Sequence, residues 1–332
     1  MSENSNIVEV NNLSTVFTTA AGLVPAVGGV SFTLGRNETL GIVGESGSGK
    51  TVLSRTIMGL QPRTNVTVSG SVKINGFEVV GASEEEKRSI WGTEVAMVFQ
   101  DPMTSLNPTM KIGKQIDEAL RVRLGMSKAD AKQKAIELLE LVGIPSPAER
   151  YSAYPNALSG GMRQRVVIAA ALACSPKLLM ADVPTTGLDV TIQAQILNLL
   201  DEIKERMHMS VILVTHDLGV VATRTSRIIV MYAGRIVETG TTEQVFNRHR
   251  MPYTRALLES SPRVSDASHT RLKAIPGCPP NLLKLTEGCA FAPRCSFATD
   301  KCHTQRPELE DASEPGHKFA CWNPLAVTGA TN

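Results

Sequence analysis

Short apolar runs separated by turn residues characterise the first third of the chain. They are rich in β-branched residues or alternate apolar with polar positions, which is typical of strands. Turn residues such as Asn75 and Gly76 separate the runs and support this division. We therefore expect strands at residues 7–10, 30–34, 39–43, 71–74 and 94–99.

From about residue 102 the pattern becomes helical and charged. Ser127 and Asp130 have the spacing of a capping box, ahead of apolar residues on one helix face at Ile136, Leu139 and Val142. The pattern predicts an inserted helical subdomain over about residues 102–157.

After Ser159, helical and strand patterns alternate. An alanine-rich helix is expected up to Cys174 and a second helix at 192–207, with buried strands at 178–181, 211–214 and 228–231. Strands that alternate with helices form a parallel sheet covered on both faces, so the fold class is α/β with a mostly parallel sheet core and an antiparallel β subdomain. From about residue 240 the alternation fades, which divides the chain into residues 1–240 and a C-terminal extension, 241–332.

Composition narrows the classes of function. The formal charge of +2 and an aromatic content of 4% argue against nucleic acid as a partner, because phosphate backbones and stacked bases need basic and aromatic surfaces. No run of 18 apolar residues occurs, and the first residues lack the pattern of a secretion signal. We therefore expect a cytoplasmic protein whose six cysteines are thiols or metal ligands.

The most informative segment is the sequence GESGSGKT, between an apolar strand pattern and a helical one. Glycines at such a turn let successive backbone N–H groups surround one anion at a helix N-terminus. Lys50 would bind the outer phosphates of a nucleotide, and the Thr51 hydroxyl would be a ligand of Mg²⁺. The predicted nucleotide-binding residues of this segment are Gly44, Glu45, Ser46, Gly47, Ser48, Gly49, Lys50 and Thr51.

A second anion site is predicted where the sequence LSGGMRQR begins a helix. Ser159, Gly160 and Gly161 would supply a hydroxyl and backbone donors to a phosphate there. One nucleotide in one domain does not need two such sites. The economical interpretation is that two domains pair head to tail, each completing the nucleotide site of the other.

These motifs make the chain resemble an ATP-binding subunit of an ABC transporter over about residues 7–240. The resemblance implies that Asp182 is the Walker B carboxylate, a ligand of Mg²⁺, and that Gln100 lies in the Q-loop, contacting Mg²⁺ or the attacking water. It implies a D-loop at Leu188 and Asp189, and a switch histidine, His216, at the terminal phosphate. Phe17 is expected to stack on adenine.

Val183 departs from the family pattern, which places a glutamate directly after the Walker B aspartate. Valine has no acceptor for a water proton, and loss of a positioned general base typically slows a reaction about a hundred- to ten-thousand-fold. We therefore expect the chain to bind ATP but to hydrolyse it poorly at its own site. Val183 could belong to a naturally asymmetric pair, or it could be a deliberate substitution that traps the ATP-bound dimer; the intact remaining motifs favour the second.

Four cysteines near the C-terminus, Cys289, Cys295, Cys302 and Cys321, have the spacing C-x5-C-x6-C-x18-C. Four thiolates can ligate one metal centre, and the spacing alone leaves zinc, an iron–sulfur cluster and free thiols open. The segments PYTRALLESSPR, IPGCPPNL and GCAFAPRC resemble the C-terminal extension of oligopeptide and dipeptide ABC ATPases. That resemblance implies a [4Fe-4S] cluster rather than zinc.

The resemblance also implies where the chain acts and which subunits it binds. It would be a peripheral subunit on the cytoplasmic face of the bacterial inner membrane, with a homologous second ATP-binding subunit, two transmembrane permease subunits and an extracytoplasmic substrate-binding protein. The sequence DPMTSLNP at 101–108 supports the branch of importers for peptides and nickel. A nickel or other small-solute importer and a non-hydrolysing regulatory subunit remain alternatives to peptide import.

Overall fold

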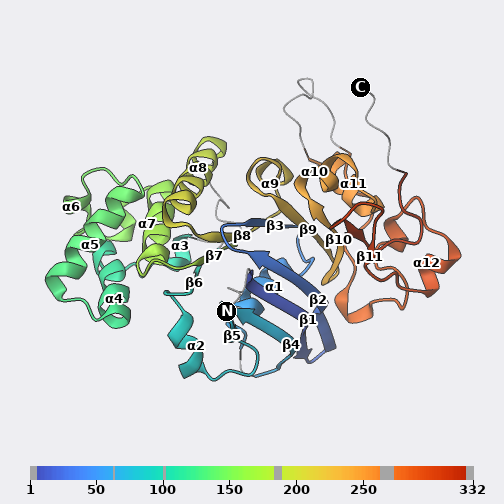
Figure 1. Cartoon of the computed structure of the whole chain (residues 1–332), viewed down its shortest axis with the longest axis horizontal. Coiled ribbons are helices and arrows are strands. Elements are labelled where there is room, and N and C mark those ends of the chain that lie inside the picture. Colours follow the sequence, from blue (N-terminus) through green and yellow to red (C-terminus); the bar gives the residue numbers. More distant parts are fainter. Residues whose placement is uncertain (1–5, 63, 100–101, 183–188, 262–272, 327–332) are drawn as a thin grey trace. The chain divides into compact units, whose positions relative to one another are not determined.

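The computed structural model describes residues 6–62, 64–99, 102–182, 189–261 and 273–326 (Figure 1). Their contacts divide the chain into two units, and each is described by itself. The first unit consists of Met1–Val8, Leu34–Glu38 and Ile74–Ile212, and the second of Glu9–Thr33, Thr39–Lys73 and Leu213–Asn332.

The core of the second unit is a sheet with both parallel and antiparallel pairs. β3 (Thr39–Val43) pairs in parallel with β9 (Arg227–Tyr232), and β9 pairs antiparallel with β10 (Arg235–Thr241). Every residue of β3 is buried, as expected for a strand covered on both faces. The sheet continues from β10 to two short strands of the C-terminal extension, β12 (Lys318–Phe319) and β11 (Glu310–Asp311).

A second sheet has the strand order β2-β1-β4, formed by β1 (Asn6–Thr19), β2 (Gly22–Gly35) and β4 (Val66–Ile74). β1 and β2 are much longer than the strands expected at 7–10 and 30–34. Their adjoining ends, Thr18–Thr19 and Gly22–Leu23, are exposed, so the apolar pattern that marks a strand fades there. Backbone pairing between β1 and β2, rather than burial of their side chains, therefore accounts for the extra length of the two strands.

The helices of the second unit are α1 (Lys50–Ile57), α9 (Leu218–Arg224), α10 (Thr242–Asn247), α11 (Pro252–Glu259) and α12 (Asp300–Thr304). Three aromatic rings, Tyr232 of β9, Tyr253 of α11 and Phe291 of the extension, pack together with centroids 4.5 to 5.4 Å apart. The extension therefore shares a hydrophobic core with the strand that follows α9. The apolar side chains of the extension are thus buried against those of the rest of the unit.

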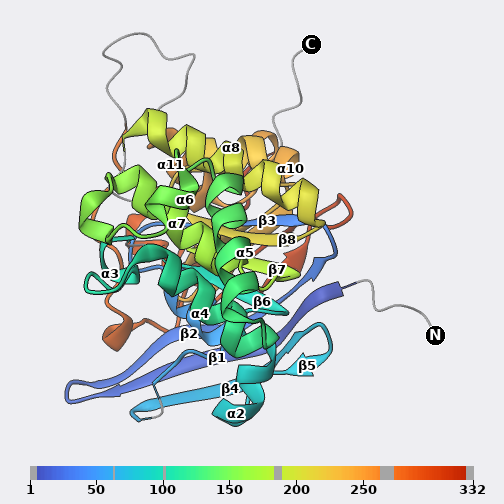
Figure 2. The same ribbon diagram turned by 90° about the vertical axis from the view of Figure 1, so that its left-hand side faces the viewer.

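The first unit contains the parallel pair β6 (Val95–Val98) and β7 (Leu178–Asp182), with β5 (Phe77–Glu78). Its helices, several of which face the viewer in Figure 2, are α2 (Glu84–Ile90), α3 (Pro102–Ser105), α4 (Ile112–Leu124), α5 (Lys128–Leu141), α6 (Pro147–Arg150), α7 (Gly160–Leu172) and α8 (Val190–Met207). A short 3-10 turn, η1 (Pro155–Ala157), precedes α7.

Ser127 precedes α5 and its hydroxyl accepts a hydrogen bond from the backbone N–H of Asp130 at 3.2 Å, which is the N-cap half of the predicted capping box. The Asp130 carboxylate accepts from the Ser127 hydroxyl at 2.7 Å rather than from the Ser127 backbone, so the box is incomplete. Within the same unit, the Tyr151 hydroxyl donates a hydrogen bond to the buried carboxylate of Asp117, which joins α4 to the turn after α6.

The strands predicted at 39–43, 178–181, 211–214 and 228–231 are confirmed, the third by β8 (Ser210–Thr215). The sequence interpretation missed α2, α9 and β10. Among the described residues, no helix combines the length and the apolar composition required to cross a membrane.

Candidate functional site

The segment between β3 and α1 forms a glycine-dependent loop. Gly44, Gly47 and Gly49 all have positive φ, at 152°, 79° and 101°. A Cβ on Gly44 would lie 2.3 Å from the carbonyl oxygen of Met231, and one on Gly49 would lie 2.5 Å from that of Ala26. Close approach of backbone thus requires glycine at two of these positions, whereas at Gly47 only the backbone angle does.

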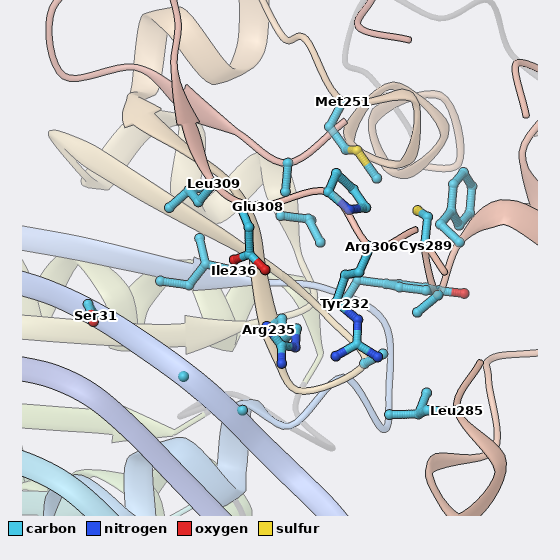
Figure 3. Close-up of a pocket in the computed structure, with 18 residues that line it drawn as sticks. Ser31, Tyr232, Arg235, Ile236, Met251, Leu285, Cys289, Arg306, Glu308 and Leu309 are labelled. Carbon is cyan, nitrogen blue, oxygen red and sulfur yellow. The ribbon is translucent and has the colours of Figure 1, made fainter. Parts of the chain in front are cut away.

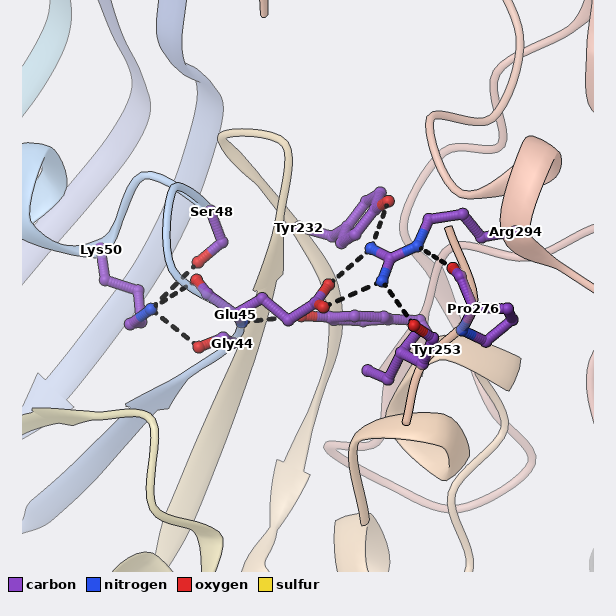
Figure 4. A network of polar contacts seen from close by, with 9 residues as sticks. Gly44, Glu45, Ser48, Lys50, Tyr232, Tyr253, Pro276 and Arg294 are labelled. Atoms are coloured by element: carbon purple, nitrogen blue, oxygen red, sulfur yellow. Dashed lines mark hydrogen bonds and ion pairs between the residues drawn. The ribbon is translucent and has the colours of Figure 1, made fainter. Parts of the chain in front are cut away.

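Lys50 is the first residue of α1 and its side chain is buried inside the loop. Its ammonium group donates to the carbonyl oxygens of Gly44 and Glu45, both at 2.8 Å, and to the Ser48 hydroxyl at 3.3 Å (Figure 4). The charge of Lys50 is therefore held inside the curve of the loop, at the N-terminus of a helix. Such a helix start attracts anions, so the arrangement suits the phosphates of a nucleotide.

Glu45 connects the loop to the C-terminal extension. Its carboxylate accepts two hydrogen bonds from Arg294, at 2.7 and 2.9 Å, and its backbone N–H donates to the Tyr253 hydroxyl at 2.9 Å (Figure 4). Arg294 also donates to the Tyr232 hydroxyl at 3.2 Å and to the carbonyl oxygen of Pro276 at 2.7 Å. Because the side chain of Arg294 is only 5% exposed, these contacts are shielded from water.

This network shifts the pKa values of its members in the directions that its contacts dictate. Hydrogen bonds to Glu45 raise the pKa of Arg294, because they stabilise its charged form. Burial raises the pKa of Tyr232 and of Tyr253, so both hydroxyls stay neutral at ordinary pH. The sequence interpretation missed this network, although Tyr253 and Arg294 lie in segments that resemble the family extension.

A tight turn between β9 and β10 supports the other side of the loop. Ala233 and Gly234 both have positive φ, at 48° and 78°, as a two-residue hairpin turn requires. The backbone N–H of Gly234 donates to the carbonyl oxygen of Ser48 at 2.9 Å, and its own carbonyl oxygen accepts from Gly28 at 2.9 Å. The turn thereby holds the loop against the β1–β2 sheet of the same unit.

Phe17 and His216 also belong to the second unit. Phe17 lies on β1 with a half-buried side chain, and His216 follows β8 with an exposed one. Asp217, directly after His216, caps α9 by accepting from the backbone N–H of Gly219 at 2.8 Å. This cap fixes the backbone that carries His216, whose contact with a phosphate stays a prediction, as does the stacking of Phe17 on adenine.

Other predicted site residues belong to the first unit. Ser159 is the N-cap of α7 and accepts from the backbone N–H of Met162 at 3.3 Å, while Asp189 caps α8 by accepting from Ile192 at 2.9 Å. A Cβ on Gly161 would lie 2.8 Å from the side chain of Ile192, so this glycine permits close packing between α7 and α8. Gly160 begins α7, and Ser159 and Asp189 are exposed.

Asp182 ends β7 with a side chain that is 2% exposed. A carboxylate at the carboxyl end of a buried parallel strand is a typical ligand position in α/β sheets. Gln100, Val183 and Leu188 lie outside the described residues.

The four cysteines of the extension lie in one region of the second unit. The backbone N–H of Cys289 donates to the carbonyl oxygen of Cys302 at 2.8 Å, and the amide of Asn323 contacts the Cys302 sulfur at 3.4 Å. Burial, reinforced by the other three thiols, raises the pKa of Cys321 to about 12. Burial also raises the pKa values of Cys289 and Cys295.

These thiols do not form a single-ion site. In the part of the chain that the structure describes, no group of three or more His, Cys, Asp or Glu side chains is placed to hold a metal ion. Zinc–sulfur bonds of about 2.3 Å would bring four sulfurs within about 4 Å of one another. As it stands, the arrangement of the described residues supports neither a zinc site nor the [4Fe-4S] cluster expected from the sequence.

Comparison with known proteins agrees with this geometry. Residues 27–186 match the family described as ABC transporter, and residues 237–302 match the family described as oligopeptide/dipeptide transporter, C-terminal region. The chain is 50% identical over 319 residues to the oligopeptide transport ATP-binding protein OppD of Bacillus subtilis, covering 96% of this chain and 89% of that protein. It is 46% identical over 323 residues to the dipeptide transport ATP-binding protein DppD of Escherichia coli, covering 97% and 98%.

Solved structures give the same result for the fold. A dimeric post-hydrolysis state of the ATP-binding cassette MJ0796 bound to ADP and Pi is 28% identical, with a TM-score of 0.64, and covers 71% of this chain and 98% of that one. The phosphate loop, the mixed sheets and the two family matches have one explanation. The chain belongs to the ATP-binding subunits of ABC transporters, in the oligopeptide and dipeptide transporter family.

Proposed function

We propose that this chain binds and hydrolyses ATP to power the import of oligopeptides or dipeptides through an ABC transporter. The observation that carries the proposal is the loop of Gly44 to Thr51, in which the Lys50 ammonium is held at the start of α1, an arrangement that suits phosphate. The names of the relatives, oligopeptide and dipeptide transport ATP-binding proteins, support peptides as the cargo.

The assembly follows from this role. The chain acts at the cytoplasmic face of the membrane, where it pairs with a homologous ATP-binding subunit beneath two permease subunits. An extracytoplasmic substrate-binding protein delivers the peptide. The dimeric structures of a related cassette support pairing between subunits.

Within the pair, the phosphate loop of one subunit and Ser159, Gly160 and Gly161 of the other bind one triphosphate. Thr51, Asp182 and Gln100 hold Mg²⁺, which neutralises the charge of the phosphates. His216 contacts the terminal phosphate, Asp189 borders the site, and Phe17 stacks on adenine. ATP closes the dimer because it binds the closed form more tightly than the open one.

Val183 limits this chain's own site in our proposal. Without a carboxylate beside Asp182, no side chain at that position takes a proton from the attacking water. The chain then binds ATP firmly, and its Ser159 segment completes the more active site of its partner. A regulatory subunit that binds ATP without hydrolysing it is the alternative that this valine favours.

The transport assignment is tested with the whole complex in lipid nanodiscs or proteoliposomes. We expect ATP-dependent uptake of a dipeptide or oligopeptide, and loss of uptake in the variant Lys50→Ala. Uptake of nickel but of no peptide would overturn the proposed cargo.

The role of Val183 is tested in the same complex by comparing ATP hydrolysis before and after Val183→Glu. We expect about a hundredfold or larger gain in the turnover of this site, measured with the partner's site inactivated. No gain would favour the regulatory alternative.

We further propose that Cys289, Cys295, Cys302 and Cys321 hold a [4Fe-4S] cluster, whose cube spaces its four ligands more widely than one zinc ion does. Support comes from the common region in which the four cysteines lie. The other three thiols also contribute to the raised pKa of Cys321. Anaerobically purified complex should contain about four iron and four sulfide per chain. Cys321→Ser should lower both, whereas Cys278→Ser, at an exposed cysteine outside this set, should lower neither.

The domain division also stays a proposal. Residues 1–240 form the nucleotide-binding domain with its helical subdomain at about 102–157, and residues 241–332 form the extension.

A further inference from the structure

A cavity of about 250 Å³ lies between the β9–β10 hairpin and the C-terminal extension (Figure 3). Much of its lining is apolar, including Ile236, Met251, Leu285 and Phe291. The volume is slightly below the range of about 300–1,000 Å³ that is usual for drug-sized ligands, so an occupant would be small.

Two arginines and one glutamate interrupt this apolar lining. Figure 3 shows Arg235, Arg306 and Glu308 converging in the middle of the cavity. Arg306 donates to the carbonyl oxygen of Thr286 at 3.1 Å. Among the residues that the structure describes, the guanidinium of Arg235 makes no hydrogen bond and no ion pair within 4 Å, and the exposed Glu308 forms no such pair with either arginine.

The charges of the cavity are therefore unbalanced. The pKa of Arg235 is lowered first by burial and then by the positive charge of Arg306, while Glu308 offsets part of this effect. A partly buried guanidinium that lacks an acceptor loses hydration without compensation. A carboxylate or phosphate placed between the two arginines would supply charge-assisted, bidentate hydrogen bonds.

We propose that this cavity binds a small organic anion, with a carboxylate or phosphate group at Arg235 and Arg306 and a short apolar body against Met251 and Leu285. No residue of the phosphate loop lines the cavity, so this site is distinct from the nucleotide site.

The position of the cavity connects its occupant to the phosphate loop. Gly28 and Ala233 line the cavity, and Gly234, between Ala233 and Arg235, donates to the carbonyl oxygen of Ser48. An occupant that presses on this turn acts on the backbone that supports the loop. We infer that binding of the anion changes the affinity for ATP, and that ATP changes the affinity for the anion by the same factor.

The binding site is tested on the full chain with methionine methyl groups labelled with ¹³C and the nucleotide site saturated with MgADP. The probes are phenylphosphate, phenylacetate and the uncharged phenylacetamide. Either anion should shift the methyl resonance of Met251, assigned with Met251→Leu, and the two anions distinguish phosphate from carboxylate recognition. We expect binding at least about tenfold weaker for phenylacetamide and for Arg235→Gln or Arg306→Gln.

Arg206→Gln, at an exposed arginine of α8, is the matched control and should bind like the unaltered chain. Leu285→Trp fills the cavity without changing its charge, and it should abolish binding even if the arginine variants fold poorly. Equal binding of phenylacetate and phenylacetamide, or shifts that spare Met251, would overturn the proposed site.

The coupling is tested by measuring the affinity for MgATP with and without saturating phenylacetate. We expect at least about a fivefold change, the lower end of the usual range of couplings, and we expect it to disappear in Leu285→Trp. Identical affinities in the unaltered chain would overturn the coupling.

Discussion

Arg294 of the C-terminal extension holds Glu45 of the phosphate loop in a two-pronged ion pair, with N–O distances of 2.7 and 2.9 Å. The two residues are 249 positions apart in the chain. Because Arg294 directly precedes Cys295, the segment that carries the proposed cluster ligands also orients the loop proposed to bind phosphate. The extension is thus part of the support of the proposed nucleotide site.

Removing this support should weaken nucleotide binding. Arg294→Ala leaves Glu45 without its partner and the loop less fixed, and we expect about three- to tenfold weaker binding of MgATP by calorimetry. Arg294→Lys should have a smaller effect, since lysine keeps the charge but not the two-pronged geometry. Arg88→Ala removes an exposed pair with Glu84 and should leave binding unchanged. Unaltered affinity in Arg294→Ala would show that the pair does not position the loop.

The glycines of the loop should differ in their tolerance of a side chain. Gly47→Ala adds a methyl group in open space, so only its backbone angle costs energy, about 1–2 kcal/mol in the free energy of unfolding. Gly49→Ala adds a clash with the carbonyl of Ala26, and we expect a cost of about 3–5 kcal/mol. Urea titration of both variants measures the difference. Equal costs would contradict the close approach seen here.

A buried carboxylate on β10 should contribute strongly to stability. Glu238 accepts hydrogen bonds from the backbone N–H groups of Arg250 and Met251, at 2.6 and 3.2 Å, and contacts the His317 ring nitrogen at 2.9 Å. Glu238→Ala leaves these partners buried and unpaired, at a cost of about 3–5 kcal/mol. Glu84→Ala, at an exposed ion pair, should cost less than about 1 kcal/mol in the same urea titration. A Glu238→Ala variant as stable as Glu84→Ala would refute this role.

Alkaline pH should destabilise the first unit through Tyr151. Burial and the hydrogen bond to Asp117 raise the pKa of Tyr151 to about 12 in the folded state, against about 10 in the unfolded state. A raised folded pKa gives stability that is fully present below about pH 10 and is lost as the pH rises through about 12. Tyr151→Phe should remove this part of the pH dependence. Unfolding titrations at pH 8 and pH 11 check it, and an equal loss in both proteins would contradict the assignment.

Local patterns predicted the elements that depend on local chemistry. The strand at 39–43, the glycine turn after it and the cap at Ser127 follow from neighbouring residues, and the structure contains all three. The helix α2 also had a local signal, because Ser83 and Glu86 form a complete capping box, but its charged sequence lacks an apolar stripe. The position of Gly234 against Ser48 had no local signal.

Contacts between distant segments could not be predicted in the same way. The pairing of β12 with β10 joins Phe319 to Glu238, and the contact of Arg294 with Glu45 spans most of the chain. Neither segment has a hydrophobic periodicity from which its partner in the fold could be predicted. The resemblance of the extension to a family indicated its importance, but only the folded chain identified which side chains reach the phosphate loop.

The hairpin turn at Ala233 and Gly234 limits where the protein can be labelled. An inserted epitope or fluorescent protein there would disrupt the hydrogen bond to Ser48 and distort the glycine-dependent loop. Gly125, at the end of α4, offers a safer place, because it is exposed and a Cβ added to it meets no neighbouring atom within 4 Å. Reporter fusions should therefore be built into the junction between α4 and α5.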